Sequence, residues 1–268
     1  MHVKLSAQER DFEGRDLLEK FEFAKSVGFD GIELSAQGDG VFTARLDELR
    51  RARAAGVVMP SAVVAMPYFL GSLDEADRRR ARDEIGRILG TLAEAGALGI
   101  VTPNAFAAFS KALPPFVPPQ DYARSREFLV NALAELGQIA VGEGVEVWLE
   151  PLNRYEDWIV NTLADAVSIV EEVGSTGVAV IADTFHMSVE ETDIGAAILA
   201  AGDKVHHIQL GDSDRKEPGH GHYDWTETLR AFDEVGYDGW WAMECGLSGS
   251  PADVLPRVSA LLKRDTLR

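Results

Sequence analysis

Four side chains that can bind a metal ion each stand at the end of an apolar run in the second half of the sequence. They are Glu150 in VWLEPL, Asp183 in VIADTFHM, Gln209 in HHIQLGD and Glu244 in WWAMEC. A single acidic residue in such a place is usually a capping or ion-paired group. Three carboxylates that meet at one point would raise one another's pKa unless a cation lay among them. The set of four therefore predicts a site for one divalent metal ion.

The elements that must position these residues alternate between short apolar runs and helix-period segments. Strands are predicted over residues 2–6, 30–35, 59–66, 99–104, 145–151, 178–183, 205–211 and 239–245. Amphipathic helices are expected between them, for example over 16–27 and 122–142, and glycines follow near their ends at positions 28, 56, 96, 144, 202 and 236. This pattern predicts a (β/α)8 TIM barrel of the α/β class, as a single domain over residues 1–268.

A barrel of this kind places its chemistry where strands end and the following loops begin. Glu150, Asp183, Gln209 and Glu244 fall at the ends of the last four predicted strands, from which inward-facing side chains could reach a common point. The Pro- and Phe-rich connection 103–120 is long enough for a functional loop over the barrel mouth. Glu33, at the end of the second strand, is expected to orient a hydrogen bond at that mouth.

Composition limits the partners of the chain. Its 268 residues are 46% hydrophobic, and 44 acidic against 26 basic side chains give a net charge of −18. Such a charge repels nucleic-acid backbones and anionic membranes. No apolar run approaches the roughly 18 residues of a membrane span, and charges follow the N-terminus where a signal peptide would be apolar. We therefore expect a cytoplasmic protein without a nucleic-acid or membrane partner.

Several motifs together resemble one known superfamily. The chain resembles the sugar phosphate isomerase/epimerase superfamily of xylose isomerase-like TIM barrels in the motifs LEPLNRYE, ADTFHM, HHIQLGDSDR followed by EPGHGHYDW, and WAMEC. The likeness covers nearly the whole chain and is greatest to ketose 3-epimerases of the D-tagatose 3-epimerase type. It implies a sugar substrate, a homo-oligomer of two or four subunits, and a single metal bound by the four strand-end residues. It also implies substrate contacts from Glu156, His186 and Arg215.

One ligand position departs from the epimerase pattern, because Gln209 stands where the family usually has histidine. A similar glutamine occurs in the hydroxypyruvate isomerase branch, so ligation through the amide oxygen fits the superfamily. Four oxygen donors favour Mg²⁺ or Mn²⁺, with Co²⁺ as a further candidate. His207, two residues earlier on the same face of the strand, is the rival third ligand, although it would lie a full pleat deeper.

The resemblance also implies a reaction. The family's counterparts of Glu150 and Glu244 lie on opposite faces of the substrate, where one removes a proton next to a carbonyl and the other returns a proton from the far side. The bound metal polarises the carbonyl and stabilises the enediolate. This chemistry gives an epimerase or isomerase. Two alternatives stay open: a lyase or dehydratase that expels a β leaving group from an oxidised sugar or 3-oxo-glycoside, and a non-catalytic subunit that binds a sugar or a partner.

The three predicted substrate contacts each have a simpler interpretation. Arg215 could instead pair with Asp212 or Asp214 on its own loop, and Glu156 could pair with Arg154. A lone histidine on a loop, such as His186, is usually solvated.

Overall fold

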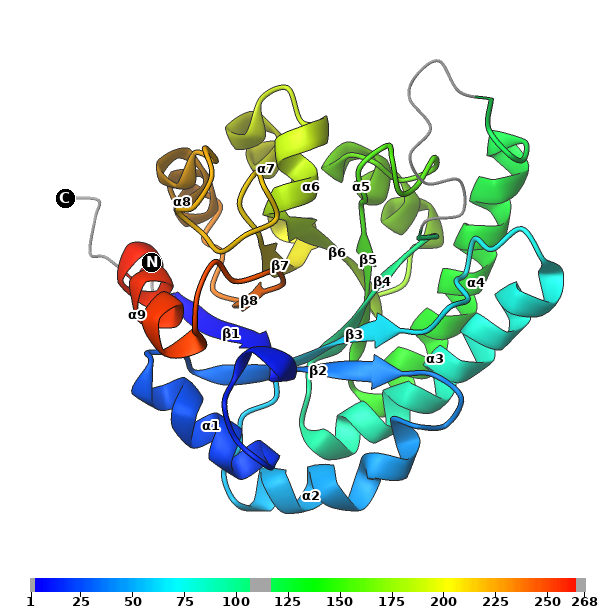
Figure 1. Ribbon diagram of the computed structural model, residues 1–268. Helices are drawn as coiled ribbons and strands as arrows, with labels where there is room; N and C mark the ends of the chain where they lie inside the picture. Colours follow the sequence, from blue (N-terminus) through cyan, green and yellow to red (C-terminus); the bar gives the residue numbers. More distant parts are fainter. Residues whose placement is uncertain (1–2, 107–116, 264–268) are drawn as a thin grey trace.

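Eight parallel strands close into a barrel in the computed structural model, which describes residues 3–106 and 117–263 (Figure 1). The strands are β1 (Lys4–Gln8), β2 (Gly31–Gln37), β3 (Ser61–Ala65), β4 (Gly99–Pro103), β5 (Glu146–Glu150), β6 (Val178–Asp183), β7 (Val205–Leu210) and β8 (Trp240–Met243). Each strand pairs with its neighbours in chain order, and β8 pairs with β1 to close the ring. The predicted TIM-barrel fold is therefore confirmed.

Helices surround the barrel (Figure 1). They are α1 (Leu17–Ser26), α2 (Leu46–Ala54), α3 (Glu75–Ala95), α4 (Tyr122–Glu143), α5 (Leu163–Val173), α6 (Thr184–Glu190), α7 (Ile194–Ala201), α8 (Trp225–Glu234) and α9 (Pro251–Leu262). Short 3-10 turns are η1 (Glu9–Asp11), η2 (Thr43–Arg45) and η3 (Gly202–Lys204). On α4, Leu129, Leu133 and Leu136 recur at helical spacing and are fully buried against the barrel.

Local signals fix where helices begin and end. Asp16 caps α1 by accepting a hydrogen bond from the Glu19 amide, and Asp121 caps α4 in the same way from Arg124. The six glycines predicted near helix ends all adopt positive φ angles, for example 78° at Gly96 and 73° at Gly144. These angles are strained for residues with a Cβ atom, so glycine is required to turn the chain back towards the next strand.

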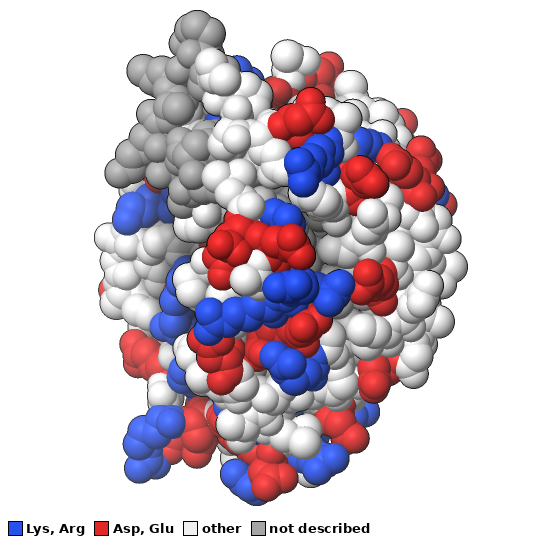
Figure 2. All heavy atoms as spheres, turned by 90° about the vertical axis from the view of Figure 1, so that its right-hand side faces the viewer, with Lys and Arg blue, Asp and Glu red and all other residues white. Residues whose placement is uncertain are grey.

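The face formed by α3 and α4 mixes charges of both signs (Figure 2). Arg82 on α3 contacts Glu135 on α4 at 3.1 Å, which joins the two helices by an ion pair. Acidic and basic side chains are interleaved on this face, as on an ordinary solvated surface. Within residues 3–106 and 117–263, no helix is both long and apolar enough to cross a membrane.

Most predicted strand boundaries shift by one or two residues, and two of these shifts matter for the site. The first strand covers 4–8 rather than 2–6, because residues 6–8 pair with β2 and residues 4–7 pair with β8. The last strand ends at Met243, so Glu244 lies on the loop just beyond it. Of the predicted mouth loop 103–120, residues 107–116 lie outside the described residues.

Candidate metal and substrate site

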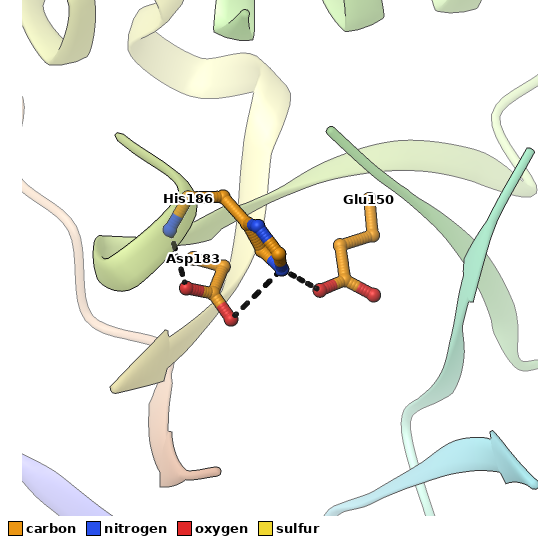
Figure 3. A group of neighbouring side chains, drawn as sticks. All are labelled: Glu150, Asp183 and His186. Carbon is orange, nitrogen blue, oxygen red and sulfur yellow. Dashed lines mark hydrogen bonds and ion pairs between the residues drawn. The ribbon is translucent and has the colours of Figure 1, made fainter. Parts of the chain in front are cut away.

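Three potential metal ligands converge at the carboxyl ends of β5 and β6 (Figure 3). Glu150 ends β5, Asp183 ends β6, and His186 lies in the first turn of α6. One ligand atom of each lies within 4.8 Å of the others, and all three residues are buried. Asp183 also caps α6, because its Oδ1 accepts hydrogen bonds from the amides of Phe185 (2.7 Å) and His186 (3.1 Å). Its Oδ2 is left facing the site.

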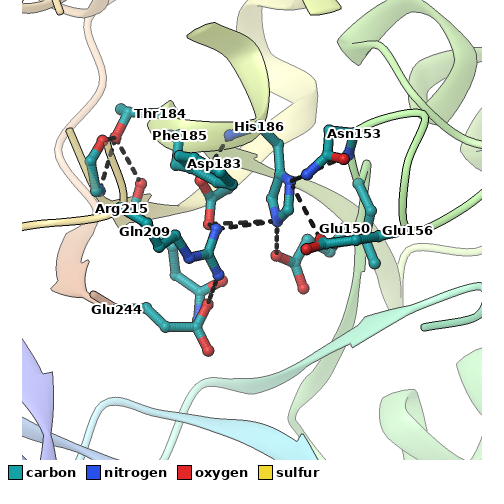
Figure 4. Close-up of polar contacts among 12 residues, drawn as sticks. Glu150, Asn153, Glu156, Asp183, Thr184, Phe185, His186, Gln209, Arg215 and Glu244 are labelled. Atoms are coloured by element: carbon teal, nitrogen blue, oxygen red, sulfur yellow. Dashed lines mark hydrogen bonds and ion pairs between the residues drawn. The ribbon is translucent and has the colours of Figure 1, made fainter. Parts of the chain in front are cut away.

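The other two predicted ligands lie beside this group, where Figure 4 draws them together with Arg215. Gln209 is level with Asp183 in the β6–β7 register and is fully buried. Its Nε2 donates to Glu33, whereas its Oε1 has no hydrogen-bond partner among the described residues. Glu244 accepts a hydrogen bond at Oε1 from Gln8 Nε2 at 2.8 Å.

These side chains suit a divalent cation. A buried acceptor without a donor is costly unless something else binds it, and the Gln209 Oε1 is such an atom. Together with the carboxylates of Glu150, Asp183 and Glu244 it offers oxygen donors, which hard divalent ions prefer. The residues therefore fit the metal that the sequence predicts. His186 adds a nitrogen to the cluster.

Arg215 supplies the positive charge that faces these carboxylates. Its Nη1 lies 3.4 Å from Asp183 Oδ2, and its Nη2 lies 3.5 Å from Glu244 Oε2. The guanidinium also covers the Phe185 ring at 4.5 Å from the centroid. The alternative pairing with Asp212 is not found, because that carboxylate accepts hydrogen bonds from its own loop and from Trp225.

Asp214, the other alternative partner of Arg215, instead contacts His220 at 2.7 Å. With both loop pairings absent, the guanidinium is directed into the site rather than held on the surface (Figure 4).

His186 is held in one orientation by the loop after β5. Its Nδ1 accepts hydrogen bonds from the backbone amide of Asn153 (3.0 Å) and from the side-chain amide of Asn153 (2.9 Å). Its Nε2 faces the site, 3.1 Å from Arg215 Nη1 and 3.6 Å from Glu150 Oε1. Burial lowers the pKa of His186 to about 4, so the ring is neutral at physiological pH.

Glu156 lies at the edge of the same group, with Oε2 3.7 Å from His186 Nδ1 (Figure 4). Burial raises its pKa above the ordinary value. The simpler pairing with Arg154 is absent, because Arg154 binds Glu190 through several hydrogen bonds, including 2.8 Å from Nη2 to Oε2.

The two predicted catalytic carboxyls have strongly perturbed acidities. Burial, followed by the charges of Glu244 and Asp183, raises the pKa of Glu150 well above its ordinary value. Burial also raises the pKa of Glu244 to about 7, although the nearby Arg215 lowers it. A carboxyl group with a pKa of about 7, as in Glu244, can exchange protons near neutral pH, which general acid–base catalysis requires.

A cavity of about 300 Å³ opens over these groups. One wall is polar and is formed by Glu150, Glu156, His186, Arg215 and Glu244. The opposite wall is mostly apolar and includes Val63, Met66, Phe69, Pro103 and Phe106. A cavity of this size and lining suits a small polar ligand with one less polar side.

Sequence reasoning missed two residues that support the site. Gln8, which binds Glu244, lies outside the strand predicted over residues 2–6, although Lys4, Ser6 and Gln8 alternate along β1. Asn153, which fixes His186, lies within the motif LEPLNRYE, but nothing in the motif predicts its contact with His186. His207 lies one pleat below Gln209, level with Ile181, where its Nε2 is 3.0 Å from Glu33 Oε1.

Comparison with known proteins identifies relatives along nearly the whole chain. A family profile described as xylose isomerase-like TIM barrel matches residues 21–264. The chain is 34% identical over 239 residues to a 3-dehydro-D-guloside 4-epimerase of Escherichia coli K12, which covers 88% of this chain and 90% of that protein. It is 32% identical over 232 residues to a D-psicose 3-epimerase of Agrobacterium fabrum, covering 83% and 77% of the two chains.

Solved structures of epimerases are also similar to this chain along nearly its whole length. A crystal structure of a 3-keto-D-glucoside 4-epimerase from E. coli superimposes with a TM-score of 0.89 at 31% identity, over 97% of this chain and 98% of that one. A D-psicose 3-epimerase from Clostridium cellulolyticum H10, solved with D-tagatose, superimposes with a TM-score of 0.77 at 28% identity, over 97% of both chains.

Proposed function

The chain belongs to the xylose isomerase-like TIM barrel family, and on that premise we propose that it is a metal-dependent epimerase of a keto-sugar in which Glu150 and Glu244 form the acid–base pair. Its relatives place it among the enzymes of the isomerase and epimerase class. The observation that carries the proposal is that both carboxyls line one cavity and have raised pKa values.

The proposed substrate is a 3-keto-glycoside whose configuration changes at carbon 4. The similarity to the guloside 4-epimerase extends over about nine-tenths of both chains. The barrel also superimposes better on the glucoside 4-epimerase than on the psicose 3-epimerase, with TM-scores of 0.89 and 0.77. A free ketose altered at carbon 3 is the second candidate, supported by 40% identity to a D-psicose 3-epimerase over 124 residues.

The metal would be held by Glu150, Asp183, Gln209 and Glu244. We propose Mn²⁺ or Mg²⁺ because the four donors are oxygen atoms. When bound, the ion polarises the substrate carbonyl and so acidifies the neighbouring C–H bond. Arg215, His186 and Glu156 border the same cavity and are proposed to hold substrate oxygens. The Arg215 guanidinium, whose Nη1 lies 3.1 Å from His186 Nε2, stabilises negative charge that develops on oxygen.

The proton steps follow from the positions of the two glutamates, which lie on either side of Asp183 and Arg215 (Figure 4). One deprotonated carboxylate removes the proton from the carbon beside the carbonyl. The other, protonated, delivers a proton to the opposite face of that carbon and inverts it. In the metal-free protein, burial and neighbouring carboxylates raise the pKa values of both groups.

Solvent exchange tests this function. Protein loaded with Mn²⁺ is incubated in deuterated water with 3-keto-glycosides, free ketoses and ketose phosphates, and the products are read by NMR. We expect deuterium at carbon 4 of a 3-keto-glycoside together with its 4-epimer. Exchange at carbon 3 of a free ketose would select the second candidate. Loss of the aglycone or of water without an epimer would make the protein a lyase, and no exchange on any substrate would support a binding subunit.

The assembly and location belong to the same proposal. We propose a homo-oligomer of two or four subunits in the cytoplasm. Light scattering on the purified chain measures the mass, and a mass of 29.2 kDa would contradict the oligomer.

A further inference from the structure

Below the candidate metal site, Glu33 forms the centre of a buried group of hydrogen bonds. It lies on β2 and has no exposed surface. Its Oε1 accepts from Ser61 Oγ at 2.9 Å and lies 3.0 Å from His207 Nε2, while its Oε2 accepts from Gln209 Nε2 at 3.1 Å. All three partners are also fully buried. The carboxylate thus contacts a donor on each of β3 and β7 across the barrel interior.

This contact decides which way the Gln209 amide faces. A side-chain amide has one donating and one accepting end, and its neighbours determine the orientation. A carboxylate only accepts hydrogen bonds, so the NH₂ group of Gln209 must face Glu33. The oxygen is then turned away from Glu33, and Oε1 is the atom that has no partner among the described residues.

The same group of contacts occupies one ring nitrogen of His207 and holds the ring below the predicted ligands. The imidazole stacks on Trp148 with ring centroids 4.6 Å apart and planes within 10°, and its Nε2 is directed at Glu33. The ring is therefore fixed one pleat below the level of Asp183 and Gln209. The Nε2 of the alternative third ligand thus contacts Glu33 rather than the predicted metal site.

We infer that Glu33 is a positioning residue that forces Gln209 to present oxygen, not nitrogen, to the metal and thereby keeps the site an oxygen-donor site. This inference rests on the metal site of the proposed function. Hydrogen-bond partners of metal ligands typically change metal affinity by 10- to 100-fold when they are removed. Glu33 also lies close enough for its charge to raise the pKa of Glu244, so positioning must be separated from a general effect of charge.

Mn²⁺ binding by the full-length protein separates these roles. Metal is removed with a chelator, and Mn²⁺ affinity is measured by electron paramagnetic resonance for wild type, Glu33→Gln, Gln209→Ala and the double variant. We expect Glu33→Gln to weaken Mn²⁺ binding about tenfold or more. In the Gln209→Ala background the same change should cause no further loss, because the residue through which Glu33 acts is gone. An equal loss in both backgrounds would overturn the inference, as would wild-type affinity in Glu33→Gln.

Two further variants guard against a damaged fold. Ser61→Ala removes another hydrogen bond to Glu33 at the same depth but leaves the bond to Gln209, and it should bind Mn²⁺ within about twofold of wild type. Glu33→Asp keeps the charge but shortens the reach, so it should behave like Glu33→Gln. Wild-type affinity in Glu33→Asp would mean that charge alone matters and would also refute the inference.

Turnover distinguishes this inference from the proposed function. An active epimerase whose Mn²⁺ affinity does not depend on residue 33 would refute only the role of Glu33. The expected binding pattern in a protein that exchanges no substrate proton would refute the epimerase and leave the role of Glu33 intact.

Discussion

The two walls of the cavity differ in what they offer a substrate. The wall from β5 to β8 carries Glu150, Glu156, His186, Arg215 and Glu244, whereas the wall at the ends of β3 and β4 carries Val63, Met66, Phe69, Pro103 and Phe106. Charged groups that can move protons therefore lie on one side only. If the proposed function holds, we expect the reacting carbons of the sugar to face the β5–β8 wall, and the β3–β4 wall to fix the shape of the ligand and exclude water.

The largest expected effect comes from removing either carboxyl of the polar wall. Glu150→Gln and Glu244→Gln each keep the shape of the side chain but cannot exchange a proton, so turnover should fall at least about a thousandfold. Steady-state rates on the substrate found by solvent exchange measure the loss, and circular dichroism checks the fold. A variant with near wild-type rate would show that its carboxyl is neither the acid nor the base.

A buried pair links the segments that follow β4 and β5 and should make stability depend on pH. Asn104 follows β4, Asp157 lies on the loop after β5, and Asn104 Nδ2 donates to Asp157 Oδ1 at 2.9 Å. Both side chains are fully buried, and burial raises the pKa of Asp157 from 3.8 to about 7. The folded protein thus binds a proton that the unfolded chain has released, so stability falls as pH rises between these two values.

Asp157→Asn removes this proton while keeping an oxygen for the amides of Trp158 and Ile159. The free energy of unfolding of the variant minus that of wild type should increase by roughly 2 to 3 kcal/mol from pH 5 to pH 8. Urea unfolding of both metal-free proteins at the two pH values measures the change. A difference that does not vary with pH would mean that Asp157 is ionised in the folded state throughout.

Metal affinity of the polar wall should depend on pH in the opposite direction. The pKa of Glu244 is about 7 without metal, so Mn²⁺ must displace a proton below that pH. We expect affinity to fall by up to about tenfold per pH unit from pH 7 to pH 6, and to level off above pH 8. Calorimetric titration in buffers of different protonation enthalpy counts the protons released. Equal affinity at pH 6 and pH 8 would contradict the raised pKa.

The smallest effect is expected from the apolar wall. Phe106 is 52% exposed and lies 6.3 Å from Phe69 between ring centroids. Phe106→Ala should raise KM about fivefold through lost apolar contact with the sugar, with kcat nearly unchanged. Leu18→Ala, which truncates an exposed apolar side chain on α1, serves as the control and should leave both constants unchanged. A loss in kcat alone would assign Phe106 to the chemistry and remove the distinction between the walls.

The sequence was sufficient to predict the barrel and the residues at its strand ends, because both follow from patterns along the chain. Gln209 is an example. It follows His207 by two residues on a buried strand, so it must face the same side of the sheet one pleat higher. The β6–β7 register confirms this placement, because it pairs Gln209 with Asp183. The roles of these side chains as metal ligands and of Glu156, His186 and Arg215 in binding substrate stay predictions.

Contacts between strands that lie far apart in the sequence could not be predicted from the sequence. Glu33 was expected to act at the mouth, yet it lies below it, because its depth depends on how far β2 is shifted against β1 and β3. Gln8 was missed for the same reason, since its contact with Glu244 spans 236 positions in the chain. Shifts between neighbouring strands are set by the closure of the whole barrel, and no local pattern records them.

The contact between Glu33 and Gln209 also constrains how this protein can evolve. A histidine at position 209 would bring a ring in place of an amide, and Glu33 would then face a donor of different length and direction. Because both positions are fully buried, a mismatch between them costs stability as well as metal binding. Residues 33 and 209 are therefore expected to covary among descendants of this chain. A change of metal preference would then require linked substitutions on two strands that lie far apart in the barrel.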